Sequence, residues 1–126
     1  MFGDTKAFSS FSVDDLAKAK EFYGGTLGLR VSDSEFGVVF LHPANGDSRI
    51  MVYPKDNHAP ANFTVLNFPV DDIDQAVDAL TARGVRFERY DGFKQDEKGI
   101  VRDEMGPGIA WFTDPAGNII AVLQES

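Results

Sequence analysis

The stretch Phe11-Ser-Val-Asp-Asp-Leu-Ala-Lys-Ala-Lys-Glu-Phe22 returns in the second half of the chain as Phe68-Pro-Val-Asp-Asp-Ile-Asp-Gln-Ala-Val-Asp-Ala79. The phenylalanine, the valine, both aspartates and one alanine are identical at matching positions. A duplicated supersecondary unit constrains a fold more strongly than the propensity of any single segment. The sequence therefore predicts two similar modules in tandem.

Each copy of the repeat reads as a strand that passes into a helix. Apolar residues alternate at Phe11 and Val13 and again at Leu66, Phe68 and Val70, which is the period of a strand. The aspartate pair suits a helix start, because aspartate accepts hydrogen bonds from free backbone N–H groups and complements the helix dipole. The predicted helices, each about three turns long, carry the apolar stripes Leu16, Ala19, Tyr23 and Leu27, and Ile73, Ala76, Val77 and Leu80.

Short β-rich runs follow each predicted helix and are separated by polar or glycine-containing turns. They cover 29–34, 36–41 and 48–53 in the first half and 85–90, 109–113 and 118–124 in the second. The sequence thus predicts an α+β fold. Its single domain, 1–126, would consist of two βαβββ modules, 6–54 and 61–124.

The polar stretch 91–108 is long for a loop in a small domain. Two interpretations of this stretch stay open: it is a lid or binding loop, or it is a loop that only extends into solvent.

Composition excludes several classes of function. The 126 residues include 12 Lys and Arg against 20 Asp and Glu, so the net charge is -8; this charge repels nucleic acid and anionic membranes. No apolar run approaches the roughly 20 residues of a membrane-spanning helix, and residues 1–8 do not read as a secretory signal. Cysteine is absent, which removes disulfides and thiolate metal sites. We expect a cytoplasmic protein that binds neither nucleic acid nor membrane.

The two tandem βαβββ units, each with a Val-Asp-Asp-Leu or Val-Asp-Asp-Ile junction, resemble the vicinal oxygen chelate superfamily. The turn Phe112-Thr-Asp-Pro-Ala-Gly-Asn118 before the last predicted strand carries the same resemblance. This superfamily includes glyoxalases, bleomycin resistance proteins and dioxygenases. The resemblance spans Lys6 to Gln124 and implies curled mixed sheets that form a cup, helices outside, and a homodimer. It also implies a divalent metal in the cup.

The family pattern places the metal ligands on the first and last strand of each module. In this sequence those positions correspond to Phe8 and Met51 in the first module and to Val65 and Ala121 in the second. None of these side chains, nor of their immediate neighbours, is His, Asp, Glu or Cys. Because a metal site needs several converging donor atoms, we expect a cup without a metal or other cofactor.

Strand alternation adds further residues to the expected cup face. The candidate ligand-contacting residues are Phe8, Ser10, Ser12, Arg49, Met51, Tyr53, Val65, Asn67, Trp111, Phe112, Ala121 and Leu123. Arg49 suits a carboxylate or phosphate on a small ligand; the alternative is an exposed cation that pairs with Asp47. Of the two neighbouring aromatic residues Trp111 and Phe112, one faces the cup and the other packs under a helix, and the sequence leaves open which.

The sequence assigns no catalytic role to the remaining titratable residues. His42 precedes Pro43 and His58 lies near Pro60, so both histidines are expected in solvated turns. The carboxylates near loops that could reach the cup are Glu35, Asp103 and Glu104.

The leading hypothesis is a metal-free protein of this superfamily that binds a small, partly apolar molecule, as bleomycin resistance proteins sequester a drug. The first alternative is a lyase, isomerase or dioxygenase with displaced metal ligands or metal-free acid–base chemistry. The second is an interaction module whose sheet edges pair between chains.

Overall fold

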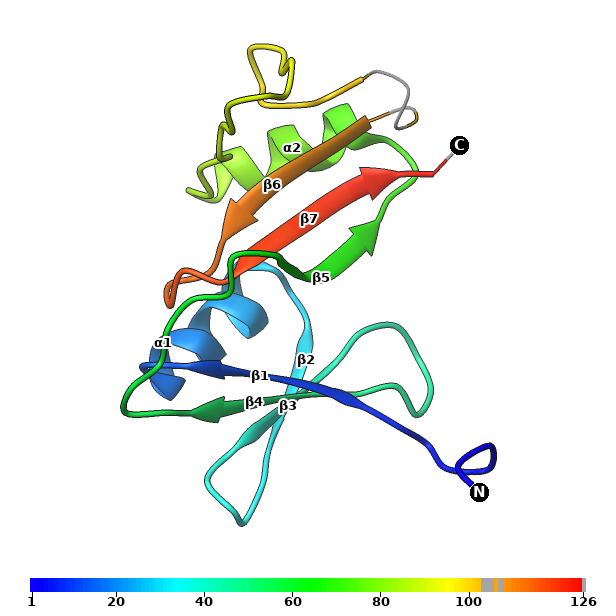
Figure 1. The fold of residues 1–126 in the computed structure, drawn as a ribbon, viewed down its shortest axis with the longest axis vertical. Coiled ribbons are helices and arrows are strands. Elements are labelled where there is room, and N and C mark those ends of the chain that lie inside the picture. The colour runs from blue at the N-terminus through cyan, green and yellow to red at the C-terminus, as the bar shows by residue number, and fades with distance from the viewer. Residues whose placement is uncertain (103–105, 107, 126) are drawn as a thin grey trace. The chain divides into compact units, whose positions relative to one another are not determined.

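A computed structural model describes residues 1–102, 106 and 108–125 of the chain (Figure 1). It contains a four-stranded sheet and a three-stranded sheet, each with parallel and antiparallel neighbours. The predicted α+β fold class is therefore confirmed. The chain divides into two compact units, unit 1 (Met1–Ala59) and unit 2 (Pro60–Ser126), while the module bounds 6–54 and 61–124 stay predictions.

Unit 1 consists of one mixed sheet and one helical segment. Its strands are β1 (Ser9–Val13), β2 (Arg30–Asp33), β3 (Val39–His42) and β4 (Ile50–Pro54). They lie in the order β1-β4-β3-β2, with β1 parallel to β4 and the other pairs antiparallel. The helical segment is α1 (Leu16–Lys20) and its continuation η1 (Glu21–Thr26).

The helix of unit 1 begins where the aspartate pair predicts. The Asp15 side chain accepts a hydrogen bond from the Lys18 backbone N–H at 3.1 Å, which satisfies one of the free donors of the first turn. Tyr23 and Ala19 of the predicted stripe are buried, and the Tyr23 ring lies 5.8 Å from that of Phe11 on β1. The helical segment therefore covers the side of the sheet that carries Phe11.

The second half of this helix departs from the predicted α-helix. Residues Glu21–Thr26 form a π-helix, and the Leu27 N–H donates to the Phe22 carbonyl at 2.9 Å. Two consecutive glycines, Gly24 and Gly25, lie within it, and glycine weakens the preference for regular α-helix.

The predicted strand over 36–41 is too long at its beginning. The Ser34 hydroxyl accepts hydrogen bonds from the backbone N–H groups of Phe36 and Val38, and Gly37 has a φ of 77°. These interactions form a turn in which the Phe36 side chain is exposed. Strand β3 consequently begins at Val39 and extends to His42.

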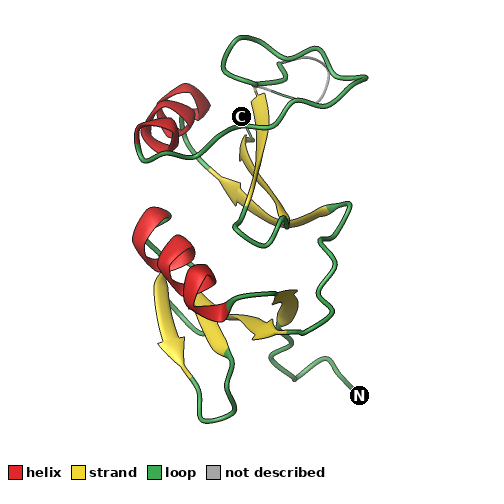
Figure 2. Cartoon of the chain, turned by 90° about the vertical axis from the view of Figure 1, so that its left-hand side faces the viewer, coloured by secondary structure: helices red, strands yellow, loops and turns green. Residues whose placement is uncertain are grey.

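Unit 2 repeats the arrangement with a smaller sheet. Its elements are β5 (Thr64–Pro69), α2 (Ile73–Ala82), β6 (Gly108–Thr113) and β7 (Ile119–Gln124), and the strand order is β5-β7-β6. Asp72 caps α2 by accepting from the Gln75 backbone N–H at 3.0 Å. The buried cluster under α2 consists of Ile73, Val77, Ile100, Ala110 and Val122. In each unit taken by itself, the helix lies along one side of the strands (Figure 2).

The predicted strand over 85–90 is not formed as a strand. Only Phe87 bridges to β6, at Phe112. The Gln95 side chain accepts from the Tyr90 N–H at 2.8 Å and donates to the Glu88 carbonyl at 3.0 Å. These backbone groups, which a neighbouring strand would use, are thus bonded to a side chain instead.

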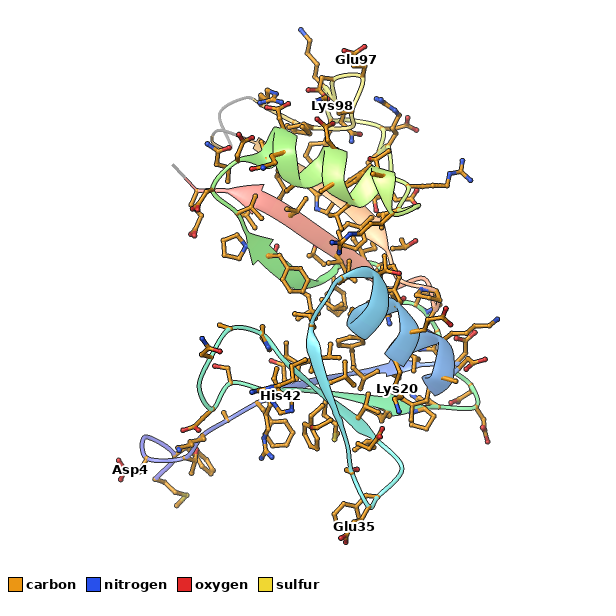
Figure 3. All side chains as sticks on the ribbon, turned by 180° about the vertical axis from the view of Figure 1, so that it is seen from behind. Asp4, Lys20, Glu35, His42, Glu97 and Lys98 are labelled. Carbon is orange, nitrogen blue, oxygen red and sulfur yellow. The ribbon has the colours of Figure 1, made fainter. Side chains whose placement is uncertain are left out.

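The described part of the polar stretch 91–108 is held against α2 by charged side chains. Lys98 lies 3.4 Å from Asp74 and 3.1 Å from Asp78, and Arg102 lies 2.6 Å from Asp74. Figure 3 shows Lys98 on the loop beside this helix. Ile100 in the same stretch is buried in the cluster under α2. Residues 91–102 therefore pack as part of unit 2, whereas 103–105 and 107 lie outside the described residues.

The ion pairs of this stretch shift two carboxylate pKa values. The hydrogen bond from Arg102 lowers the pKa of Asp74. Burial opposes a similar change at Asp96, but hydrogen bonds from the Ile100 N–H, Arg102 and the Lys98 N–H outweigh it and lower that pKa as well. A carboxylate with a lowered pKa stabilises the folded state above its ordinary pKa, and this contribution is lost as the pH falls through the folded-state pKa.

We predict that Asp74→Asn lowers the Tm at pH 7, because the amide no longer holds Lys98 and Arg102 by charge. The difference from the parent should shrink as the pH falls below the ordinary carboxyl pKa of 3.8 and disappear once the pH is below the lowered pKa of Asp74 in the folded state. Thermal unfolding followed by circular dichroism across this range measures it. The control is Asp56→Asn, an exposed residue without an ion pair in the part of the chain described; a Tm change equal to that of Asp74→Asn would contradict the prediction.

We predict that Gly108→Ala destabilises unit 2 by about 1 to 3 kcal/mol. A Cβ at this position would lie 2.9 Å from Ile73 Cγ2 and 3.1 Å from Ile100 Cγ2, and β-branched side chains have little freedom to move away. Gly3→Ala is the control, because a Cβ there meets nothing within 4 Å. Urea unfolding gives both free energies, and equal values would refute the argument.

Candidate functional site

The strands of unit 1 present one continuous face on the side opposite α1. Register places Ser10 beside Met51, Met51 beside Phe40, and Phe40 beside Ser32. We call this side the arginine face; its residues are Phe8, Ser10, Ser12, Arg30, Ser32, Phe40, His42, Arg49, Met51 and Tyr53. The alternate residues, among them Phe11 and Val52, are buried on the α1 side. The face is therefore a direct product of strand alternation.

Arg49 is the central side chain of this face. Its guanidinium carbon lies 4.3 Å from the centre of the Phe8 ring and 4.9 Å from that of Phe40. The two rings meet edge to face with their centroids 5.9 Å apart. A cation over an aromatic ring is attracted by the ring quadrupole, so the rings hold the guanidinium in place.

The alternative pairing of Arg49 with Asp47 is not found. Asp47 instead binds Lys6, with Nζ to Oδ2 at 2.6 Å. Among the residues of unit 1, all of which are described, Arg49 has no ion-pair partner. Its planar N–H groups are thus donors without an anion.

Two serine–histidine pairs lie on the arginine face. Ser12 Oγ is 2.7 Å from His58 Nδ1, and Ser32 Oγ is 2.7 Å from His42 Nε2. The predicted turn position is wrong for His42, which ends β3, whereas His58 lies in the loop after β4. Both histidines are half-buried rather than fully solvated, and each is bonded to a strand serine. These pairs can donate and accept hydrogen bonds at the face.

The structure brings the six candidate residues of the first module together on this face. These are Phe8, Ser10, Ser12, Arg49, Met51 and Tyr53. Sequence reasoning missed Arg30, Ser32, Phe40 and both histidines. The signal for Phe40 is its register opposite Met51 in the β3–β4 hairpin, which could be found by pairing the predicted strands before assigning faces.

The sheet of unit 2 resolves which neighbouring aromatic residue lies opposite its helix. Trp111 forms a buried cluster with Val101 and Ala121 on the side away from α2, and the rings of Tyr90 and Phe93 lie 5.6 and 5.1 Å from it. Phe112 points to the α2 side, where Phe87 lies 5.6 Å away.

A local register shift between β5 and β7 separates the remaining candidates of the second module into two that can be assigned to a face and one that cannot. Asn67 and Leu123 share the face of Trp111, because Asn67 is in register with Ala121 and Leu123 is two residues further along β7. Val65 lies where the register between β5 and β7 shifts, so pairing assigns it to neither face.

The side chains at the four family metal positions, Phe8, Met51, Val65 and Ala121, offer no oxygen or nitrogen donor. Nor do the residues that the structure describes contain a group of three or more His, Cys, Asp or Glu able to hold a metal ion. Residues of this chemistry do not fit the family's divalent metal at those positions. Glu35 lies in the exposed turn between β2 and β3, whereas Asp103 and Glu104 lie outside the described residues.

Among the described residues, no helix is both long enough and apolar enough to cross a bilayer.

The chain belongs to the Glyoxalase/Bleomycin resistance protein/Dioxygenase superfamily, whose family model matches residues 8–122. This confirms the family resemblance of the sequence. The antibiotic binding protein TnmS3 from Streptomyces sp. CB03234 is 28% identical, with a TM-score of 0.68 and 98% of each chain covered.

Two further proteins are similar to this chain. A superfamily member from Sphaerobacter thermophilus DSM 20745 is 25% identical with a TM-score of 0.66, covering 96% of this chain and 98% of its own. YraH of Bacillus subtilis (strain 168), a protein without an assigned function, is 28% identical over 89% of this chain and 91% of its own.

We predict that Phe93→Ala exposes Trp111, the one tryptophan of the chain. Trp111 is 7% exposed and Phe93 packs against it, so fluorescence emission should move to longer wavelength and acrylamide quenching should increase. The loss of the aromatic pair should cost about 1 kcal/mol. Phe63→Ala, at an exposed position in the same unit, is the control, and an unchanged spectrum in Phe93→Ala would show that the pair does not form.

Proposed function

We propose that this protein binds a small, partly apolar organic molecule at the arginine face and that binding requires no metal. Binding sites of this type combine apolar walls with a few polar groups that orient the ligand. Here the rings of Phe8, Phe40 and Tyr53 and the thioether of Met51 offer the apolar contacts, and Arg49 offers the polar one. The contact of Arg49 with both the Phe8 and the Phe40 ring is the observation that carries the proposal.

Two further facts support binding rather than metal-dependent catalysis. TnmS3, which shares the fold at 28% identity, is an antibiotic binding protein. The lyases, isomerases and dioxygenases of this superfamily rely on a metal for electrophilic catalysis, and the four corresponding positions of this chain are apolar. The homodimer that the resemblance implies and the cytoplasmic location that the composition favours belong to the same proposal.

A metal-free acid–base enzyme is the second candidate. It is favoured by the Ser12–His58 and Ser32–His42 contacts, both 2.7 Å long, because histidine is a common general base. The two candidates differ in what happens to the bound molecule: a binding protein returns it unchanged, whereas an enzyme converts it.

We predict that members of a panel of planar aromatic compounds raise the Tm of the full chain. A ligand at 100 times its Kd stabilises the folded state by about 2.7 kcal/mol. Phe40→Ala should weaken binding about tenfold, because it removes one ring that contacts the ligand and holds Arg49. The matched control is Phe36→Ala, whose ring is 88% exposed in a turn; calorimetry measures both.

Equal weakening in the two phenylalanine variants would contradict the assignment of the face. Native mass spectrometry before and after EDTA provides the second control. Binding that disappears with a stoichiometric metal would overturn the metal-free proposal. Conversion of the ligand in the mixture, detected by chromatography, would favour the enzyme.

A further inference from the structure

We infer that the molecule bound at the arginine face carries an anionic oxygen group, such as a carboxylate, on an apolar or aromatic body, and that Arg49 binds this group. The inference rests on the proposed function, since it names the chemical class of the ligand for the same face.

The charges of the two sheet sides are the first argument. The whole chain has a net charge of -8, yet the arginine face contains no Asp or Glu and carries the cations Arg30 and Arg49. The one acidic strand residue of unit 1, Asp33, pairs with the buried-side residue Val39 and binds Lys20 of α1 at 2.8 Å. The face is therefore locally positive on an acidic protein, which is charge complementarity to an anion.

The second argument is that Arg49 has no acidic partner within unit 1. The two rings that contact the guanidinium carry no negative charge, and a guanidinium offers five N–H donors in a planar fork. That fork matches a carboxylate, which accepts two parallel hydrogen bonds. The acidic residue nearest in sequence, Asp47, is engaged by Lys6. Arg49 thus has its position fixed by Phe8 and Phe40 and its charge unpaired within unit 1.

A cationic ligand suits this face poorly, although the net charge of the chain would attract one from a distance. The Phe8 and Phe40 ring faces that would receive a cation already hold Arg49. A second cation there would meet the guanidinium charge at contact distance. The long-range field of the chain is screened beyond about 8 Å at physiological ionic strength, so the local contacts decide the sign of the ligand.

The test compares three probes of one shape, 1-naphthoate, 1-naphthamide and 1-naphthylmethylammonium, by calorimetry on the full chain. We expect naphthoate to bind at least about tenfold more tightly than the neutral amide, and the ammonium compound to bind most weakly. Arg49→Gln should remove the preference for naphthoate, so that the affinities of this variant for naphthoate and naphthamide differ by no more than about twofold. Arg49→Lys should keep only part of the preference, because lysine keeps the charge without the planar fork.

Arg86→Gln is the charge-matched control, because it removes one exposed arginine from unit 2 and should leave the preference intact. Circular dichroism and Tm establish that the Arg49 variants are folded. Equal affinities for naphthoate and naphthamide, or a preference that survives in folded Arg49→Gln, would overturn this inference and leave the proposed function standing. Failure of all three probes to bind would overturn the proposed function with it.

Discussion

The aspartate cap at each strand-to-helix junction is the interaction on which both units depend. Asp15 and Asp72 have almost the same backbone conformation, with φ/ψ of -135°/106° and -140°/105°, and each accepts a hydrogen bond from the N–H group three residues ahead. The cap fixes where the helix begins. In unit 1 the helix covers the side of the sheet that buries Phe11 and Val13, and the arginine face is the opposite side.

Period-two alternation made the fold and most of the arginine face predictable from the sequence. Ser10, Ser12, Met51 and Tyr53 reach one side because each lies an even number of residues from its neighbour on the same strand. The same rule could not decide which of Trp111 and Phe112 lies on the helix side, since these consecutive residues point to opposite sides of the sheet and both are aromatic. Packing decides it, because the Trp111 side receives Tyr90 and Phe93 from the loop.

What escaped prediction depends on contacts between segments far apart in sequence. The partner of His58 is Ser12, across most of unit 1, and no local pattern marks that pair. Gln95 replaces a predicted strand partner by bonding to the backbone of residues 88 and 90, which propensity does not encode. Phe40 belongs to the arginine face because it is in register with Met51. Register is a property of the hairpin rather than of either strand.

The loss of the metal ligands and the position of Arg49 are connected through Phe8. In the family pattern the position of Phe8 belongs to a metal ligand, and here its ring lies under a guanidinium. A ring cannot coordinate a divalent cation, but its negative face attracts an organic one. Under the proposed function, the positive charge of this face comes from Arg49, which binds and orients an anion, whereas a metal ion would also activate a substrate as an electrophile. Under the same proposal, binding uses the rings and Arg49, and the serine–histidine pairs are the groups of this face that could convert a ligand.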